Sequence, residues 1–185
     1  MGRDAAVRGP KGRSGLSHVD RHGRVKMVDV GDKPVTDREA MARGRITMNR
    51  QALKAIREGA VAKGDPLQAA RLAGIMAAKQ TSSIIPLCHP LPLTHVSVDL
   101  TPAADGYRIE ARVRTSAQTG VEMEALVAVA AAALTVYDML KAVDKAMVIG
   151  EICLIEKRGG RSGTYRRVDR PNLSGRSVGS RRSRS

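Results

Sequence analysis

The sequence is poor in aromatic residues: it has no Trp and no Phe, and its three Tyr are its only aromatic side chains. A core without large rings has to be filled by Ala, Val, Leu, Ile and Met, which favours closely packed aliphatic helices. The 185 residues, 42% of them apolar, suffice for one compact domain with its own core and are few for two.

Cysteine and long apolar runs are scarce as well. Cys88 and Cys153 stand far apart and form no C-x-x-C pair, so the sequence indicates neither a disulfide framework nor a structural zinc site. No run reaches the roughly 18 apolar residues of a membrane span, and the N-terminal segment lacks the apolar stretch of a secretory signal. We therefore expect a soluble, cytoplasmic protein with no membrane partner and two reduced thiols.

The formal net charge of +14 would ordinarily suggest a nucleic-acid partner. Most of it lies at the ends, because residues 1–24 contribute +4 and residues 166–185 contribute +6, leaving +4 for residues 25–165. Both ends are rich in Gly, Ser and Arg and have almost no apolar periodicity. We predict one domain at 25–165 between two disordered basic tails, and a nucleic-acid partner is not favoured.

Hydrophobic periodicity predicts a mixed α+β domain. Strands are expected at 38–48, 93–100, 107–115 and 147–157, and helices at 50–58, from 65 to about 79, and from about 121 to 145. Asp65 and Pro66 suit the start of a helix, and Asp105-Gly106 suits a hairpin. The last strand is apolar on both faces, which predicts a place at the centre of the sheet. The order of elements is that of a ferredoxin-like split β-α-β unit, with one sheet covered by helices on one face.

Two places in the first half of the domain combine polar groups with an ordered backbone. Lys63 lies just before the helix capped by Asp65, where it could face an anion together with the free helix amides or could simply be solvated. Cys88 and His89 lie in IIPLCHPLPL, whose prolines fix the direction of the imidazole. His89 could equally satisfy a structural hydrogen bond, and metal binding is less favoured because no second ligand stands at suitable spacing.

Three further places follow in the second half. Glu122 and Glu124 occupy the first turn of the long helix, where the helix dipole stabilises them or where a carboxylate could hold an amino group of a guanine- or pterin-like ring. Asp138 and Lys141 are one turn apart, as a surface ion pair or as a pair tuned for proton transfer. Lys157 precedes GGRSG, which is either an amide-rich turn that wraps phosphates or an exit loop.

The long helix sets a limit on how these groups can act together. Glu124 and Asp138 are 14 residues apart, which corresponds to about 21 Å along an unbroken helix. One small substrate cannot contact both from a single chain. Either the helix is broken, or a second subunit completes the site.

Four segments in sequence resemble the cyclic pyranopterin monophosphate synthases, also called the molybdenum cofactor biosynthesis protein C family. These are MVDVGDKPVTDREAMARGRI, KGDPLQAARLAGIMAAKQTSSIIPLCHPL, TGVEMEALVAVAAAALTVYDMLKAV and MVIGEICLIEKRGGRSG. The resemblance covers about residues 27 to 165. PLCHPL, GVEMEAL and YDMLKAV, in this order and with compatible spacing, are far more specific than any single motif.

The resemblance implies a lyase of molybdenum cofactor (molybdopterin) biosynthesis. Its substrate would be the nucleotide-derived small molecule 3′,8-cyclo-7,8-dihydroguanosine 5′-triphosphate, converted to cyclic pyranopterin monophosphate with loss of diphosphate. Rebuilding the ring system needs acid/base groups, and closing the cyclic phosphate needs cations. The resemblance also implies a homohexamer, a trimer of dimers with active sites at subunit interfaces, and demands neither a metal nor a cofactor.

Residue roles follow from the same resemblance. Asp138 corresponds to a general acid/base, assisted by Lys141, and Lys63 corresponds to the other proton-transferring lysine. The implied substrate-binding residues are Leu87, Cys88 and His89 in the loop, Glu122, Met123 and Glu124 at the ring, and Arg38 and Lys157 at the triphosphate. Two features depart from the family pattern: Arg161 stands where lysine is expected in GGRSG, and the basic tails exceed the family core.

Two other classes of function remain as alternatives. A small RNA-binding or ribosome-associated protein would bind RNA in a salt-sensitive way without turnover, but the lack of Phe and Trp disfavours base stacking. An interaction scaffold without activity would tolerate Asp138→Asn.

Overall fold

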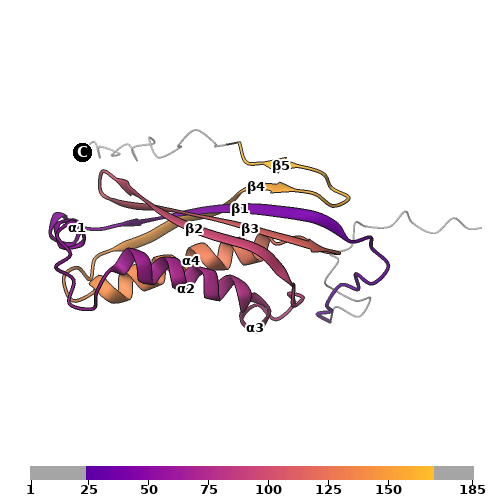
Figure 1. Cartoon of the computed structure of the whole chain (residues 1–185), viewed down its shortest axis with the longest axis horizontal. Coiled ribbons are helices and arrows are strands. Elements are labelled where there is room, and N and C mark those ends of the chain that lie inside the picture. The colour runs from indigo at the N-terminus through magenta and orange to yellow at the C-terminus, as the bar shows by residue number, and fades with distance from the viewer. Residues whose placement is uncertain (1–23, 169–185) are drawn as a thin grey trace, which may run out of the picture.

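The computed structural model describes residues 24–168, which form one antiparallel sheet with helices packed on one of its faces (Figure 1). The elements in chain order are β1 (Thr36–Thr47), α1 (Arg50–Arg57), α2 (Pro66–Lys79), α3 (Thr81–Ile84), β2 (Leu93–Ala103), β3 (Gly106–Ala117), α4 (Glu122–Leu140), β4 (Val148–Arg158) and β5 (Tyr165–Arg166). The sheet order is β2-β3-β1-β4-β5. With β5 set aside, this is the order of a ferredoxin-like fold, so the predicted α+β fold class is confirmed.

Strand β1 forms the middle of the sheet because its alternation suits a surface covered on one side only. One alternating set of its residues is buried on the helix side: Ala40, Ala42, Gly44, Ile46 and Met48. β1 pairs along its whole length with β3, from Thr36 opposite Ala117 to Thr47 opposite Gly106, and its other edge pairs with β4.

The predicted hairpin at Asp105-Gly106 joins β2 to β3 and ties both to the end of β1. The amide of Met48 donates to the carbonyl of Asp105 over 2.9 Å. A side chain at position 106 would overlap the carbonyl of Ile46, so glycine is required by this close approach of two backbones.

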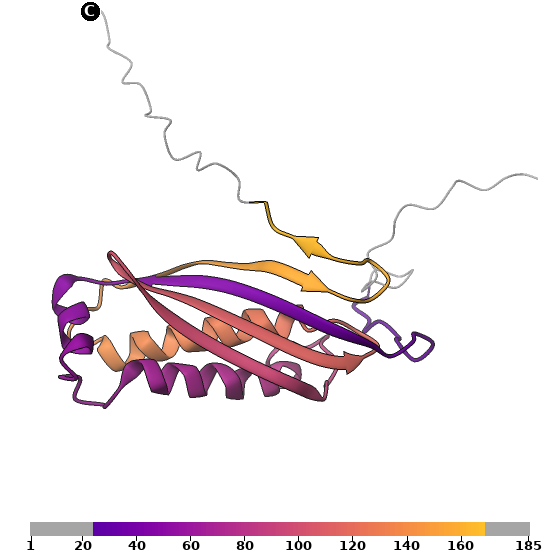
Figure 2. The same cartoon turned by 45° about the horizontal axis from the view of Figure 1, so that its top comes forward.

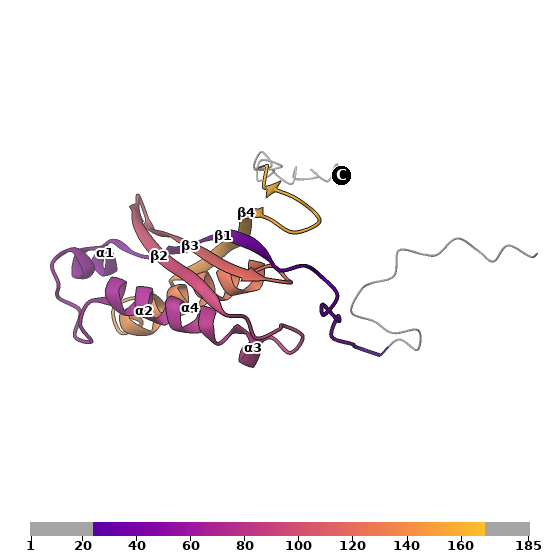
Figure 3. The ribbon, with the colours of Figure 1, turned by 45° about the vertical axis from the view of Figure 1, so that its right-hand side comes forward.

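Helices α2 and α4 lie side by side beneath the sheet, as Figures 2 and 3 show from two directions. α2 starts where the sequence predicts, because Asp65 Oδ1 accepts from the amides of Leu67 at 2.8 Å and Gln68 at 3.2 Å. Where the two helices face each other, small side chains allow close contact: Ala70, Gly74 and Ala78 on α2, and Ala125, Ala128 and Ala132 on α4, are all buried.

By length and apolar composition, α4 is the one helix within residues 24–168 that could also cross a membrane. Eight of its residues are buried, and it contacts α2 and all four long strands. This is the environment of a helix in a protein core.

Two sequence predictions about element placement are wrong. β4 is not central, because among the described strands its outer side pairs only with the two-residue β5, opposite Glu156 and Lys157. Two of its apolar side chains are partly exposed instead: Val148 is 61% and Ile152 38% exposed. A bulge at Glu151, which has φ 54°, interrupts the regular pairing of β4 with β1.

The long helix also ends earlier than predicted, at Leu140 instead of Lys145. The chain turns back there because Asp144 is buried at 7% exposure and its carboxylate accepts from the amides of Asn49 at 2.8 Å and Ala146 at 2.9 Å. β5 and α3 were not predicted, and the expected domain end at residue 165 falls inside β5. Apart from residue 24 and residues 166–168, the predicted basic tails lie outside the described residues.

Candidate active site

Six of the predicted substrate-binding residues line one cavity at the N-terminal end of α4. The cavity has a volume of about 320 Å³, and these six residues are Leu87, Cys88, His89, Glu122, Met123 and Glu124. The first three come from the proline-rich loop between α3 and β2, which is held in a turn by the hydrogen bond from the Cys88 amide to the Ile85 carbonyl at 3.1 Å. We call this space the ring cavity.

The start of α4 shapes the acidic side of the ring cavity. α4 has no side-chain cap at its first residue, and the carboxylate of Glu122 folds back over Gly120, where any β-carbon would collide with it. Two residues further on, Glu124 turns inward and is only 4% exposed. Burial, together with the nearby Glu122 carboxylate, raises the pKa of Glu124 to about 7.

Cys88 shares this environment. Burial, with a smaller effect of the neighbouring Glu124, raises the pKa of the Cys88 thiol. The thiol therefore stays protonated at neutral pH and has little nucleophilic character. Its contribution to the cavity is shape and a weak hydrogen-bonding group.

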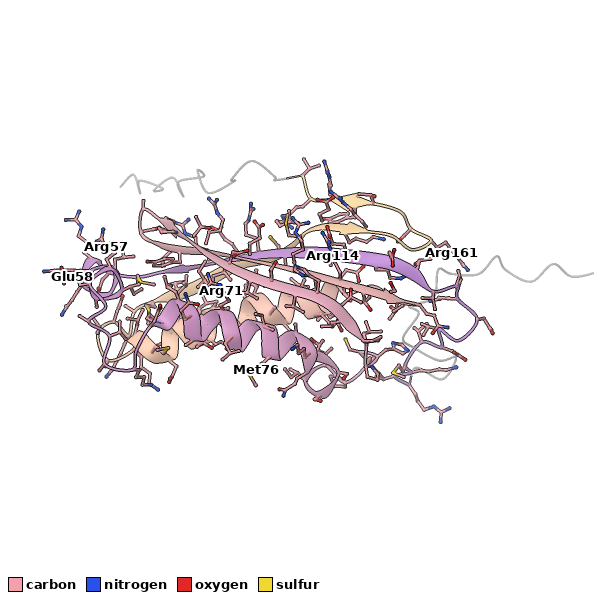
Figure 4. The ribbon with its side chains drawn as sticks, viewed as in Figure 1. Arg57, Glu58, Arg71, Met76, Arg114 and Arg161 are labelled. Atoms are coloured by element: carbon pink, nitrogen blue, oxygen red, sulfur yellow. The ribbon has the colours of Figure 1, made fainter. Side chains whose placement is uncertain are left out.

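A second and larger cavity of about 800 Å³ adjoins the ring cavity and is lined by cations. Lys33, Arg38 and Arg161 contribute positive charge to its wall, and no acidic residue within 24–168 lines it. Lys33 and Thr119 line both cavities, so the two are neighbours. We call this space the cationic cavity; Figure 4 shows Arg161 at the end of the molecule where β1 begins.

Arg38 is fixed in the cationic cavity by the end of β3. Its Nε donates to the carbonyl of Ala117 at 2.9 Å and its Nη2 to that of Gln118 at 3.0 Å. Thr36 Oγ1, in the same wall, is buried without a hydrogen-bond partner within residues 24–168. The cavity thus offers a rigid guanidinium and an unused hydroxyl to an anion.

Lys157, the other predicted triphosphate cation, does not line this cavity. Its ammonium donates to the hydroxyl of Ser162, and Ser162 is part of the wall. Lys157 therefore supports the GGRSG turn, in which Gly159 and Gly160 have φ of 87° and 73°. Only glycine adopts such angles freely.

The three predicted catalytic residues meet at the opposite end of α4. Lys63 Nζ lies 2.7 Å from Asp138 Oδ2, and Lys141 Nζ lies 2.7 Å from Asp138 Oδ1. Lys63 also donates to the backbone carbonyl of Asp138 at 3.2 Å. All three side chains are about half exposed, and we call them the lysine cluster.

The lysine cluster has a defined charge state. Hydrogen bonds from Lys141 and then Lys63 lower the pKa of Asp138 to about 2, and the same contact raises the pKa of Lys141. At neutral pH the cluster therefore holds one carboxylate between two ammonium groups. Both ammonium groups lie within hydrogen-bonding distance of that carboxylate.

The two ends of α4 are too far apart to serve one small substrate within a chain. The helix is unbroken from Glu122 to Leu140, so the 14-residue spacing of Glu124 and Asp138 corresponds to about 21 Å. In Figure 1 the cluster end of α4 lies beside the loop between α1 and α2, while its other end lies near α3.

Sequence reasoning missed Lys33 and Thr36 as lining residues. Both occur in the DKPVTDR string that carried the resemblance, but both precede the strand predicted at 38–48, and neither belongs to a motif with its own chemical signal. Within residues 24–168 no group of three or more His, Cys, Asp or Glu is arranged to hold a metal ion.

Comparison with known proteins gives a consistent result. The MoaC family model matches residues 27–160. A protein from Thermomicrobium roseum is 62% identical over 156 residues, covering 83% of this chain and 94% of its own length. One from Dinoroseobacter shibae is 60% identical over 154 residues (82% and 98%), and one from Nostoc is 55% identical over 158 residues (84% and 94%). All three are named cyclic pyranopterin monophosphate synthase. With this identity over most of its length, the chain belongs to the MoaC family.

Proposed function

We propose that the protein is a lyase that converts 3′,8-cyclo-7,8-dihydroguanosine 5′-triphosphate to cyclic pyranopterin monophosphate and diphosphate in molybdenum cofactor biosynthesis. The relatives' names support this activity. The structural observation that carries it is the pair of adjacent cavities, one with two glutamates in its wall and one lined by cations. Because the substrate is a soluble nucleotide derivative, we propose that the enzyme acts in the cytoplasm.

The two cavities match the two ends of such a substrate. A guanine-derived ring offers amino and N–H groups, from which carboxylates such as Glu122 can accept hydrogen bonds. A triphosphate needs several cations, and Lys33, Arg38 and Arg161 line a space in which the described part of the chain places no carboxylate. Lys157 acts on the phosphates through the turn that it holds. A ligand that is neutral throughout would leave these cations without a counterion.

The lysine cluster supplies the acid/base chemistry in this proposal. Lys63 and Lys141 donate and accept protons at the reacting atoms, and their ammonium groups can also stabilise negative charge that develops in the transition state. Asp138, whose pKa of about 2 keeps it ionised, orients both lysines and can accept a proton only transiently. Catalysis by positioned acids and bases of this kind typically contributes about 10² to 10⁴-fold.

The proposal includes assembly, because the cavities of one chain need the lysine cluster of another. We propose a homohexamer, a trimer of dimers with shared sites. An exposed apolar strip on the outer side of the helix layer supports association: Leu72 is 60%, Met76 50% and Leu134 60% exposed. Figure 4 shows Met76 projecting from α2 away from the sheet. Exposed apolar patches of this kind mark association surfaces.

The activity is tested by supplying the cyclised dihydro-GTP substrate and measuring diphosphate and cyclic pyranopterin monophosphate. We expect turnover by the wild-type chain and a large loss in Asp138→Asn and Lys63→Ala. Lys54→Ala, which removes a surface ion pair with Glu58 at 3.9 Å, is the matched control and should stay active. Absence of product from folded wild-type protein would contradict the proposed lyase activity.

The shared site is tested by mixing two inactive variants, one in each half of the site. Lys63→Ala has an intact ring cavity, and Glu122→Ala has an intact lysine cluster. If subunits exchange at random in a 1:1 mixture, about one site in four combines two intact halves, so activity should return to about a quarter of the wild-type value. Mixtures that stay inactive after verified subunit exchange would contradict sites shared between chains.

A further inference from the structure

Glu124 is the most deeply buried acidic side chain within residues 24–168. The next is Asp144, whose carboxylate accepts two backbone amides and is thereby compensated for the loss of water. Glu124 has no ion pair within the described residues and no hydrogen bond to another residue. Glu124 instead lines the ring cavity. A buried carboxylate without compensation is costly, and the neutral acid is the form that such a site favours.

The groups around Glu124 agree with the neutral form. From the same helix, Glu122 adds a like charge, and from the proline-rich loop come the protonated thiol of Cys88 and the imidazole of His89. Lys33 is the one ammonium or guanidinium in the wall of the ring cavity, and it forms no salt bridge with Glu124 within the described residues.

The helices and the sheet add nothing that would ionise Glu124. At the adjacent end of α2 the one charged side chain is Lys79, which is exposed, and α3 contributes the uncharged Thr81. On the sheet, Arg38 is engaged with the carbonyls of Ala117 and Gln118. Burial is thus the dominant influence on Glu124.

We propose that Glu124 binds the ring of the substrate as a neutral carboxylic acid, donating a hydrogen bond to a ring acceptor, while Glu122 accepts from a ring N–H group. This inference rests on the proposed function. A guanine- or pterin-type ring presents a carbonyl acceptor beside N–H donors on one edge. Two carboxylates would accept from the donors and repel the carbonyl, whereas one acid and one carboxylate match both. The pair thereby selects rings with this mixed edge.

The first test is the dependence of KM on pH with the cyclised dihydro-GTP substrate. Burial raises the pKa of Glu124 to about 7, so the neutral fraction is about 0.9 at pH 6 and about 0.1 at pH 8. Because only the neutral form binds the ring acceptor, KM should rise about tenfold between these values. Glu124→Gln, whose amide donates at every pH, should remove this rise, and Glu122→Gln should retain it.

The second test does not depend on turnover. The infrared spectrum of the wild-type protein should contain a protonated-carboxyl band at pH 6 that fades as pH rises to 8, and Glu124→Gln should lack it. Product formation with a KM that does not change with pH, or a spectrum without that band, overturns the inference and leaves the proposed activity standing. Absence of product at every pH argues against the activity instead, and the infrared band still decides the protonation of Glu124.

Discussion

Asp138→Asn is the substitution that best separates two roles for the lysine cluster. The pKa of Asp138 is about 2, five units below neutral pH, so about one molecule in 10⁵ carries the neutral acid at pH 7. Asp138 is therefore ineffective as a proton donor. Its structural effect is to raise the pKa of Lys141 through their 2.7 Å contact, and Asn cannot do this because it is uncharged.

Removing the carboxylate should therefore act on the lysines. We expect kcat to fall by about 10² to 10⁴-fold, as for loss of a positioned acid or base. We also expect the alkaline limb of the kcat profile to move to lower pH, because the pKa of Lys141 falls once its partner is neutral. The cluster is about half exposed, so high salt should already weaken the contact in the wild type and reduce the difference between the two proteins.

The assay is kcat from pH 6 to 10 at low and high salt, with direct titration of the Lys141 amine by NMR. Glu58→Gln, which removes the partner of Lys54 on the surface of α1, controls for a general change in charge. An alkaline limb that does not move in Asp138→Asn would refute the positioning role. If the alkaline limb disappears in Asp138→Asn while the Lys141 amine titrates as in the wild type, the group that controls the limb is Asp138.

Two further substitutions test the packing and the phosphate side. Gly74→Ala should lower the unfolding free energy by about 1 kcal/mol. The substitution gains about 1 kcal/mol of helix propensity. Its β-carbon would, however, lie 2.8 Å from the carbonyl oxygen of Ala128, and such overpacking costs about 1–3 kcal/mol. Ala77→Gly nearby should follow the ordinary propensity order, and a more stable Gly74→Ala in thermal unfolding would contradict the close packing of α2 on α4. Arg161→Ala should raise KM at least severalfold with little change in kcat, since Arg161 lines the cationic cavity away from the lysine cluster. A loss confined to kcat would place Arg161 at the reacting atoms instead.

Elements with one buried face could be predicted from the sequence. β1 and β3 alternate cleanly, and α2 has an Asp cap followed by Pro, so their positions were right to within a few residues. β4 was misplaced because apolar residues on both faces are typical of a central strand. They do not reveal that two of these apolar side chains, Val148 and Ile152, are exposed in the single chain.

The residues of the candidate site also differ in how far the sequence could predict them. The loop residues Cys88 and His89 and the helix residues Glu122 and Glu124 each carried a local signal, and the fold brings them to one cavity. Lys33 carried none, because its importance lies in the junction of two cavities formed by segments far apart in the chain. The sequence could predict which single residues carry useful chemical groups. It could not predict which residues from distant segments line the same cavity.

The contact between Lys63 and Asp138 could not be predicted from the sequence. The two residues are 75 positions apart, and neither lies in a pattern that points to the other. They meet because α2 and α4 pack closely enough, through Gly74 and its small neighbours, to bring the loop before α2 next to the last turn of α4. The same packing holds Glu124 at the far end of one rigid helix. A helix that assembles two half-sites and keeps them about 21 Å apart makes the second subunit a part of the proposed chemistry.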